Sequence, residues 1–288
     1  ISRFIQVKSD GKIETDYSVL KPKNSDGYSR DSTDFCITGL AHSSSYKVSV
    51  LPGLTAFERT TVRNLASTIS IVAKTVDMKS NIQTDPSKNI LANRNGSVVP
   101  INITNVNKFD VSLYRIDLNS LSSYSDIFRS LNQNDLRRLK SFWGEHLGTK
   151  SIEIQSQLNK TEKVNLNLDQ WLNDAKPGLF VATFESEELD RAYWDPIPTQ
   201  WFMISNIATQ IFNGRENTDV FTTQFETLEA IKDASIQVIA KNNKILFRKD
   251  LSSDGHIKIP NQYLKGSGGF APEIIIISSE IEGTTILD

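Results

Sequence analysis

Histidine, cysteine and closely spaced carboxylates are the residues of this chain that could do chemistry. The three histidines, His42, His146 and His256, are isolated in the sequence, and none belongs to a His-Glu-x-x-His or Cys/His pattern that would hold zinc. A serine nucleophile elbow, a P-loop and a dinucleotide-binding glycine fingerprint are also absent from the sequence. We therefore predict no catalytic, cofactor-binding or metal-binding residues, no cofactor and no enzymatic activity.

One acidic stretch could in principle bind calcium or supply paired carboxylates for acid-base catalysis. Its members are Glu185, Glu187, Glu188, Asp190 and Asp195. No glycine and no periodic spacing shapes them into a cage around an ion. We interpret the stretch as a solvated loop.

Three tryptophans could form a platform for a carbohydrate ring. Trp171, Trp194 and Trp201 are spread over about 30 residues, however, and Trp201 lies in an apolar run. Core packing is the better interpretation for Trp171 and Trp201. Trp194 lies in a polar loop that contains proline, and its exposure needs a structure.

The charge balance excludes some partners. The chain has 32 basic and 34 acidic residues of 288, a net charge of −2, with no block of like charges, so nucleic acid and anionic membrane surfaces are poor partners. The longest apolar run, Ile274–Ile277, is too short to cross a bilayer. Because the chain begins at Ile1 without a methionine, we expect it to be a piece of a longer protein.

The single cysteine, Cys36, excludes a disulfide within the chain. It lies in the segment from Cys36 to Leu54, which places polar and turn residues between two apolar runs and ends at Pro52-Gly53. This pattern predicts a hairpin of an antiparallel sheet in which Tyr46, Val48 and Val50 face the core. We expect Cys36 to be a buried, unpaired thiol on a strand of that hairpin.

The rest of the chain predicts mostly short strands. Residues 77–97 have the composition of a connector, and helical spacing appears only over 121–147, where two short helices fit and Asn132 is the expected N-cap of the second. Leu136, Leu139 and Phe142 would form the buried side of that helix. Strands resume and end in Glu273–Ile277, whose unbroken apolar run predicts burial on both faces.

These patterns predict a mostly β fold, a string of fibronectin- or immunoglobulin-like antiparallel sandwiches. We expect three domains, at residues 1–66, 67–207 with the helical insert 121–147, and 208–288. The length of 288 residues suits two or three domains better than a single core.

Four segments resemble the N-terminal macroglobulin-like domains of bacterial alpha-2-macroglobulins. They are the Cys36-to-Leu54 hairpin, the Val98–Ile116 strand pair, Thr199–Asn206 and Val220–Ile259, in the order that the family has. Each alone is a weak hairpin pattern, and their order carries the resemblance.

The resemblance implies the scaffold end of a large, broad-spectrum endopeptidase inhibitor that traps proteases by conformational change. It implies a periplasmic parent with a lipid anchor at its N-terminus, whose remaining domains and whose target proteases, reached through a downstream bait region, are the partners. The family's covalent trap uses a Cys-x-Glu-Gln thioester. Because Cys36 is followed by Ile-Thr-Gly, it does not match that motif.

Two alternatives remain open at this stage. An immunoglobulin-like adhesion or binding module of a bacterial surface protein would show the same turns and alternation. A sugar-active enzyme with accessory sandwiches would need two carboxylates about 5 to 10 Å apart across a cleft.

Overall fold

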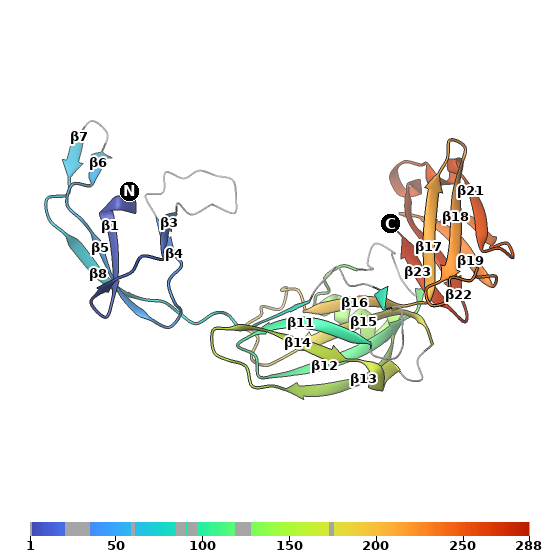
Figure 1. Cartoon of the computed structure of the whole chain (residues 1–288), viewed down its shortest axis with the longest axis horizontal. Coiled ribbons are helices and arrows are strands. Elements are labelled where there is room, and N and C mark those ends of the chain that lie inside the picture. The colour runs from blue at the N-terminus through green and yellow to red at the C-terminus, as the bar shows by residue number, and fades with distance from the viewer. Residues whose placement is uncertain are drawn as a thin grey trace. The chain divides into compact units, whose positions relative to one another are not determined.

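The structure is a computed structural model that describes residues 2–20, 35–58, 61–84, 90–91, 97–118, 128–172 and 176–287. The chain forms two compact units, Ile1–Met78 and Lys79–Asp288, which are described separately (Figure 1). Both are built from mainly antiparallel sheets, with β10 (Ile90–Leu91) and β16 (Thr199–Ile204) as a parallel pair in the second unit. The predicted mostly β fold of macroglobulin-like sandwiches is confirmed. None of the helices in the described ranges has the length and apolar character needed to span a membrane.

A four-stranded sheet in the order β2-β1-β5-β8 is the centre of the first unit. Its strands are β1 (Ile5–Ser9), β2 (Lys12–Ile13), β5 (Ser45–Val50) and β8 (Ile69–Lys74). Two pairs of short strands accompany it: β3 (Ser18–Leu20) with β4 (Cys36–Thr38), and β6 (Thr55–Glu58) with β7 (Thr61–Asn64). A 3-10 turn, Ser2–Phe4, precedes β1.

The predicted hairpin between β4 and β5 is wrong. Both strands form, but β4 pairs with β3, whereas β5 pairs with β1 and β8. At Gly39 the backbone has a positive φ of 91° and approaches so closely that a Cβ would lie 2.5 Å from the Asp16 carbonyl oxygen. This approach packs the end of β4 against the chain before β3.

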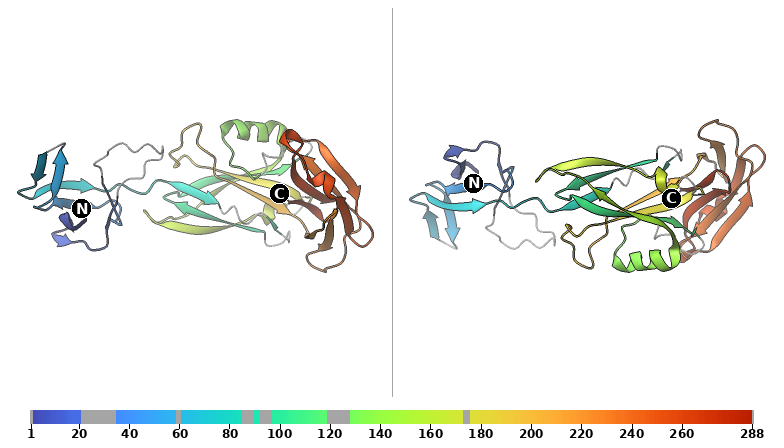
Figure 2. Two further views of the ribbon diagram at one scale, coloured as in Figure 1. Left: turned by 90° about the horizontal axis from the view of Figure 1, so that it is seen from above. Right: turned by 90° about the horizontal axis from the view of Figure 1, so that it is seen from below.

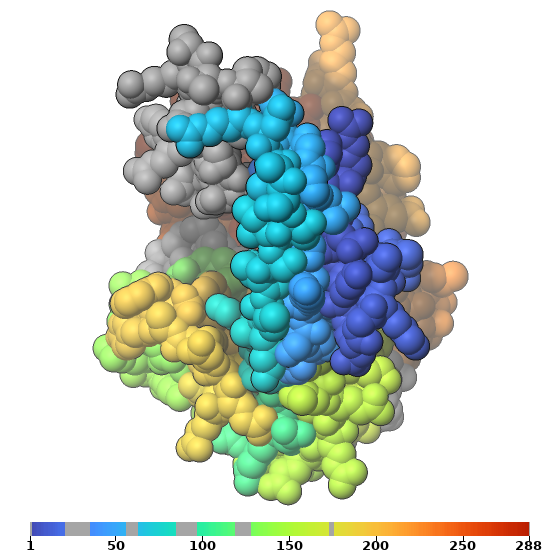
Figure 3. Space-filling view, turned by 90° about the vertical axis from the view of Figure 1, so that its left-hand side faces the viewer, coloured from blue at the N-terminus to red at the C-terminus, as the bar shows by residue number. Residues whose placement is uncertain are grey.

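The buried face of β5 differs in part from its prediction. Tyr46 is buried as expected, and its hydroxyl accepts a hydrogen bond from the Ala41 N–H. Ser49 is buried instead of exposed, because its hydroxyl is satisfied by Ser70 across the sheet. Figure 3 looks onto this unit, where the cyan atoms of the β8 edge lie at the surface.

The second unit begins with a sandwich of two sheets, which we call the middle sandwich (Figure 1). One sheet has the order β10-β16-β15-β12-β13 and the other β14-β11-β9. The strands are β9 (Asn81–Thr84), β10 (Ile90–Leu91), β11 (Val98–Thr104), β12 (Lys108–Ile116), β13 (Gly144–Glu153), β14 (Thr161–Asn167), β15 (Gly178–Glu185) and β16 (Thr199–Ile204). β11 and β12 are consecutive in the chain but lie in different sheets, and the core fills the space between them.

Residues 77–97 are more than the connector that their composition predicts. β9 lies inside this range, pairs with β11 and buries Ile82 in the core of the sandwich. Polar residues flank Ile82 on both sides, and a single apolar residue is too weak a signal for a strand.

The helical insert is shorter than predicted. α1 (Gln133–Arg138) continues as one π-helical turn, Leu139–Trp143, and ends where β13 begins at Gly144. Asn132 is the N-cap as predicted, with a complete capping box to Asp135. Residues 128–131 are not helical, and the rest of the expected first helix, 121–127, lies outside the described residues. A four-residue helix, α2 (Asp169–Leu172), follows β14.

The apolar stripe of this helix was predicted correctly except at one position. Leu136 and Leu139 are buried, but Phe142 is 72% exposed and Trp143 takes the inward place. The π turn adds a residue to the helical repeat and thereby rotates the following side chains.

The last sandwich also has two sheets, in the orders β17-β18-β21 and β20-β19-β22-β23. Its strands are β17 (Ile207–Asn213), β18 (Asn217–Gln224), β19 (Ala234–Ala240), β20 (Ile245–Asp250), β21 (His256–Pro260), β22 (Pro272–Ser279) and β23 (Gly283–Leu287), with 3-10 turns at Asn261–Leu264 and Gly268–Phe270. The expected boundary after residue 207 falls at the start of β17, and the one after residue 66 precedes β8. The division into three domains stays a prediction.

Candidate functional site

The three histidines that could do chemistry each contact a different partner. His42 contacts the Val76 carbonyl oxygen, His146 contacts Thr149, and the ring of His256 lies 2.7 Å from an Asp219 carboxylate oxygen. Within the described ranges, no three His, Cys, Asp or Glu side chains gather into a group that could hold a metal ion. The absence of a catalytic or metal site stays a prediction for the whole chain.

Two carboxylates of the acidic stretch accept hydrogen bonds from backbone N–H groups and so stabilise the loop that contains them. Glu188 accepts hydrogen bonds from the backbone N–H groups of Asn107 and Lys108, at 2.9 and 3.1 Å. Asp195 accepts one from the Ala192 N–H at 2.7 Å. These bonds fasten the loop between β15 and β16 to the start of β12, which is a structural role.

The three tryptophans do not form a platform. Trp201 is buried, and its indole N–H donates to the Arg129 carbonyl oxygen at 2.8 Å. Trp171 is half-buried in a different core, against Gly148. Trp194 is 78% exposed at the surface. Core packing is therefore confirmed for Trp201 and, at the edge of a second core, for Trp171, whereas Trp194 is exposed.

The prediction that Cys36 is buried is wrong: its thiol is exposed. β4 alternates so that Ile37 is half-buried while its neighbours Cys36 and Thr38 point outward. An apolar neighbour on each side suggested burial, but the period of a strand puts the cysteine on the opposite face from Ile37.

An apolar core joins the middle and last sandwiches. On β22, Ile274 and Ile276 pack into a core shared with the middle sandwich, while Ile277 packs into the core of the last sandwich. The predicted burial of this strand on both faces is therefore confirmed. A neighbouring sandwich covers one of the two faces, which an apolar run by itself does not predict.

The middle sandwich provides its half of the shared core from the outer face of its five-stranded sheet. Leu179 and Val181 of β15 face the shared core, while Phe180 between them faces the sandwich interior. Leu136 and Trp143 of the helical insert complete the cover. Figure 2 shows the green helix against the middle sandwich, beside the red last sandwich.

Backbone contacts fasten the same junction. Ser205 forms a β-bridge with Gly283, and the Asn206 N–H donates to the Glu282 carbonyl oxygen at 2.8 Å. The Glu282 carboxylate accepts from the side-chain amides of Asn206 and Gln224, at 2.8 and 2.7 Å. The chain between the sandwiches is thus held by hydrogen bonds of its backbone and side chains, unlike a flexible linker, whose residues make no such contacts.

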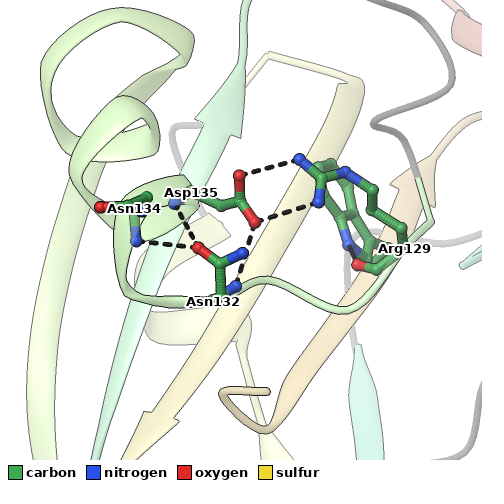
Figure 4. A network of polar contacts seen from close by, with 5 residues as sticks. Arg129, Asn132, Asn134 and Asp135 are labelled. Carbon is green, nitrogen blue, oxygen red and sulfur yellow. Dashed lines mark hydrogen bonds and ion pairs between the residues drawn. The ribbon is translucent and has the colours of Figure 1, made fainter. Parts of the chain in front are cut away.

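A network of polar contacts anchors the helical insert (Figure 4). The Arg129 guanidinium grips the Asp135 carboxylate with two hydrogen bonds, of 3.0 and 2.9 Å, and Asp135 also accepts from the Asn132 N–H. Burial alone would raise the pKa of Asp135, but the bonds from Arg129 and Asn132 outweigh it and hold that pKa below its ordinary value. The carboxylate is therefore charged at neutral pH.

Two family models match this chain. The model for the bacterial alpha-2-macroglobulin MG2 domain matches residues 86–202, and the model for the MG3 domain of the same proteins matches residues 204–288. Together the matches cover more than half of the chain. The chain belongs to the bacterial alpha-2-macroglobulin family. The two family domains meet at residues 202–204, which places the shared apolar core between an MG2-like and an MG3-like domain.

Solved alpha-2-macroglobulins share the fold. A crystal structure of the native Escherichia coli protein spanning domains MG0-NIE-MG1 is 17% identical, with a TM-score of 0.61 over 100% of this chain and 86% of that chain. A Salmonella alpha-2-macroglobulin reacted with methylamine is 18% identical, with a TM-score of 0.67 over 99% of this chain. The chain spans only 16% of that Salmonella protein. No curated protein matches the chain in sequence.

Proposed function

We propose that this segment is a non-catalytic scaffold of a bacterial alpha-2-macroglobulin, and that the parent protein traps endopeptidases by conformational change. The observation that carries the proposal is the junction between the two sandwiches. An apolar core is shared by the MG2-like and MG3-like domains, and paired backbone groups close it; these contacts should hold the two domains as one stiff body. Stiff bodies can pass on a movement that begins elsewhere in a large protein, whereas freely jointed domains would absorb it.

The remaining parts of the proposal come from family membership. The partners of the segment are the other domains of the parent, and target proteases meet the parent through a bait region outside this segment. The parent is a lipid-anchored protein of the periplasm that defends the cell against foreign proteases. Palmitate labelling and fractionation of cells that express the parent test the anchor, and recovery of unlabelled parent in the cytoplasmic fraction would contradict it.

A paired inhibition assay tests the function. The isolated segment and the full-length parent are each mixed with a panel of endoproteases, and cleavage of a large protein and of a small peptide is followed. A protease enclosed in a cage no longer cleaves the large protein, which cannot enter, but it still cleaves the small peptide. We expect this selective protection from the parent alone. Equal inhibition by the segment, or no inhibition by the parent, would overturn the proposal.

A joint variant connects the assay to the structure. Ile276→Ala, made in the parent, should loosen the junction and weaken the protection of the large substrate. Ile245→Ala is the matched control, because Ile245 lies on the same sandwich but is 47% exposed. If both variants protect as well as the parent, the junction has no part in the inhibition.

A further inference from the structure

A groove lies beside β9 in the middle sandwich. Its volume is about 590 Å³, within the range of ligand-binding clefts. Residues 79–84 and Asn102 of β11 line one side. The other side is lined by residues 189–191 and 195–198 of the loop between β15 and β16, by Thr199 at the start of β16 and by Ser130. One end is closed by a 2.9 Å hydrogen bond from the Thr84 hydroxyl to the Thr199 carbonyl oxygen. Both walls belong to the second unit, and yellow atoms of the loop reach the surface in Figure 3.

The backbone of β9 is suited to bind another strand. β9 ends the three-stranded sheet: it pairs with β11 on one side, and no described strand pairs with its other side. In an antiparallel pair, every second residue directs its N–H and C=O away from the partner strand. On β9 these groups point away from β11, where an extended peptide could satisfy them.

The opposite wall carries a guanidinium with spare donors. Among the described residues, Arg191 makes one long hydrogen bond, 3.4 Å from Nη1 to the Pro196 carbonyl oxygen, and its Nε–H is buried without an acceptor. Because Nε itself is buried, a carboxylate that arrives in the groove would bind through the Nη donors of the planar fork. Asp190 and Asp195 also line the groove, and the Asp195 carboxylate accepts a hydrogen bond from the Ala192 N–H at 2.7 Å.

The loop wall is formed before any partner arrives. Glu188 ties it to the N–H groups of Asn107 and Lys108, and the Ile197 N–H donates to the Leu131 carbonyl oxygen at 2.7 Å. A preformed wall reduces the entropy that a bound peptide would cost.

We propose that this groove binds an extended acidic segment of a partner protein, which adds a strand to the free edge of β9 and places a carboxylate against Arg191. The strand edge selects an extended backbone, and the guanidinium selects an acidic side chain. This inference goes beyond the scaffold role, because it assigns a recognition surface that the rigid junction does not need.

The test uses a fluorescent peptide of about eight alternating Thr and Val residues with one central Glu, which favours an extended conformation. A second peptide carries Gln in place of Glu, and a third carries Glu with alternate backbone amides methylated. We expect the Glu peptide to bind the segment about tenfold more tightly than the Gln peptide, the effect of a charge-assisted bond. Methylation should abolish binding, and the bound Glu peptide should slow hydrogen exchange at Asn81–Thr84.

Two protein variants assign the effect to the groove. Arg191→Gln should remove the preference for Glu over Gln. Arg215→Gln, the same change in an exposed turn outside the groove, should keep it. If Arg191→Gln shifted the loop, it would lower the affinity for the Glu peptide and for the Gln peptide by the same factor. The ratio of the two affinities therefore reports only the contact between the guanidinium and the carboxylate.

Three results would overturn the inference. They are no saturable binding of the Glu peptide up to about 1 mM, equal binding of the methylated peptide, and a Glu preference that survives Arg191→Gln. None of these results bears on the scaffold proposal, which depends on the junction.

Discussion

Gly283 of β23 lies against Pro177 so closely that a Cβ on the glycine would be 2.6 Å from the Pro177 Cβ. The same added atom would lie 2.7 Å from the Ile204 carbonyl oxygen, in the last residue of β16. The glycine also has a positive φ of 95°, which side-chain-bearing residues rarely adopt. Close packing of the two sandwiches therefore depends on the absence of a side chain at this position.

Gly283→Ala should destabilise the second unit strongly. The new methyl group meets backbone atoms that cannot move without opening the junction, and the positive φ adds its own strain. We expect the free energy of unfolding to fall by more than about 2 kcal/mol, measured by guanidinium unfolding. Gly268→Ala is the control, because Gly268 has a φ of 56° but open space around it. If the free energy of unfolding falls by the same amount in both variants, backbone strain alone explains the effect and the contact with Pro177 does not contribute.

Ile276→Ala should weaken the junction more than the last sandwich itself. Its side chain packs into the shared core, whereas that of Ile277 packs into the sandwich's own core. Each truncation should cost about 2 to 5 kcal/mol. Hydrogen exchange distinguishes them: Ile276→Ala should speed exchange on both sides of the junction, and Ile277→Ala mainly within the last sandwich. An exchange pattern common to both variants would contradict the division between the two cores.

Asp135 should make part of the stability depend on pH. Its folded-state pKa lies below the ordinary value of about 3.9, so the stabilisation it provides is complete above that value and is lost as the pH falls through the folded pKa. Asp135→Asn should therefore cost about 1 to 3 kcal/mol at pH 7, and the difference from the natural chain should shrink below about pH 4. Urea unfolding over a pH series measures it.

The control for that series is Asp190→Asn, a change of the same chemistry on an exposed residue. It should alter the free energy of unfolding by less than about 0.5 kcal/mol at pH 7. A constant difference between Asp135→Asn and the natural chain from pH 3 to 7 would mean that the Arg129 contact does not stabilise the charged form.

Cys36 should react readily with a thiol reagent in the folded protein, because its thiol is exposed on β4. Labelling with a chromogenic disulfide under native conditions should approach the rate seen after denaturation. Cys36→Ser removes the only cysteine and gives the background rate. A labelling rate limited by global unfolding would contradict the prediction, because it would mean that another part of the chain covers the thiol.

Local chemistry in the sequence was enough to predict many of the elements. The N-cap at Asn132 and the unbroken apolar run in β22 correspond to the helix and the strand that they predict, because capping and apolar runs act within a few residues. The order of four segments was enough to indicate the family, which the two domain models confirm.

Only the tertiary structure decided which surfaces meet. The partner of β4, the outward turn of Cys36 and the cover over Ile274 and Ile276 all depend on segments distant in the chain. The groove beside Arg191 likewise forms from β9 and a loop about 100 residues later in the chain. Hydrophobic periodicity predicts which face of an element is buried, but it does not predict which surface covers that face. The hydrophobic effect is non-directional, so any apolar surface of suitable shape could provide the cover.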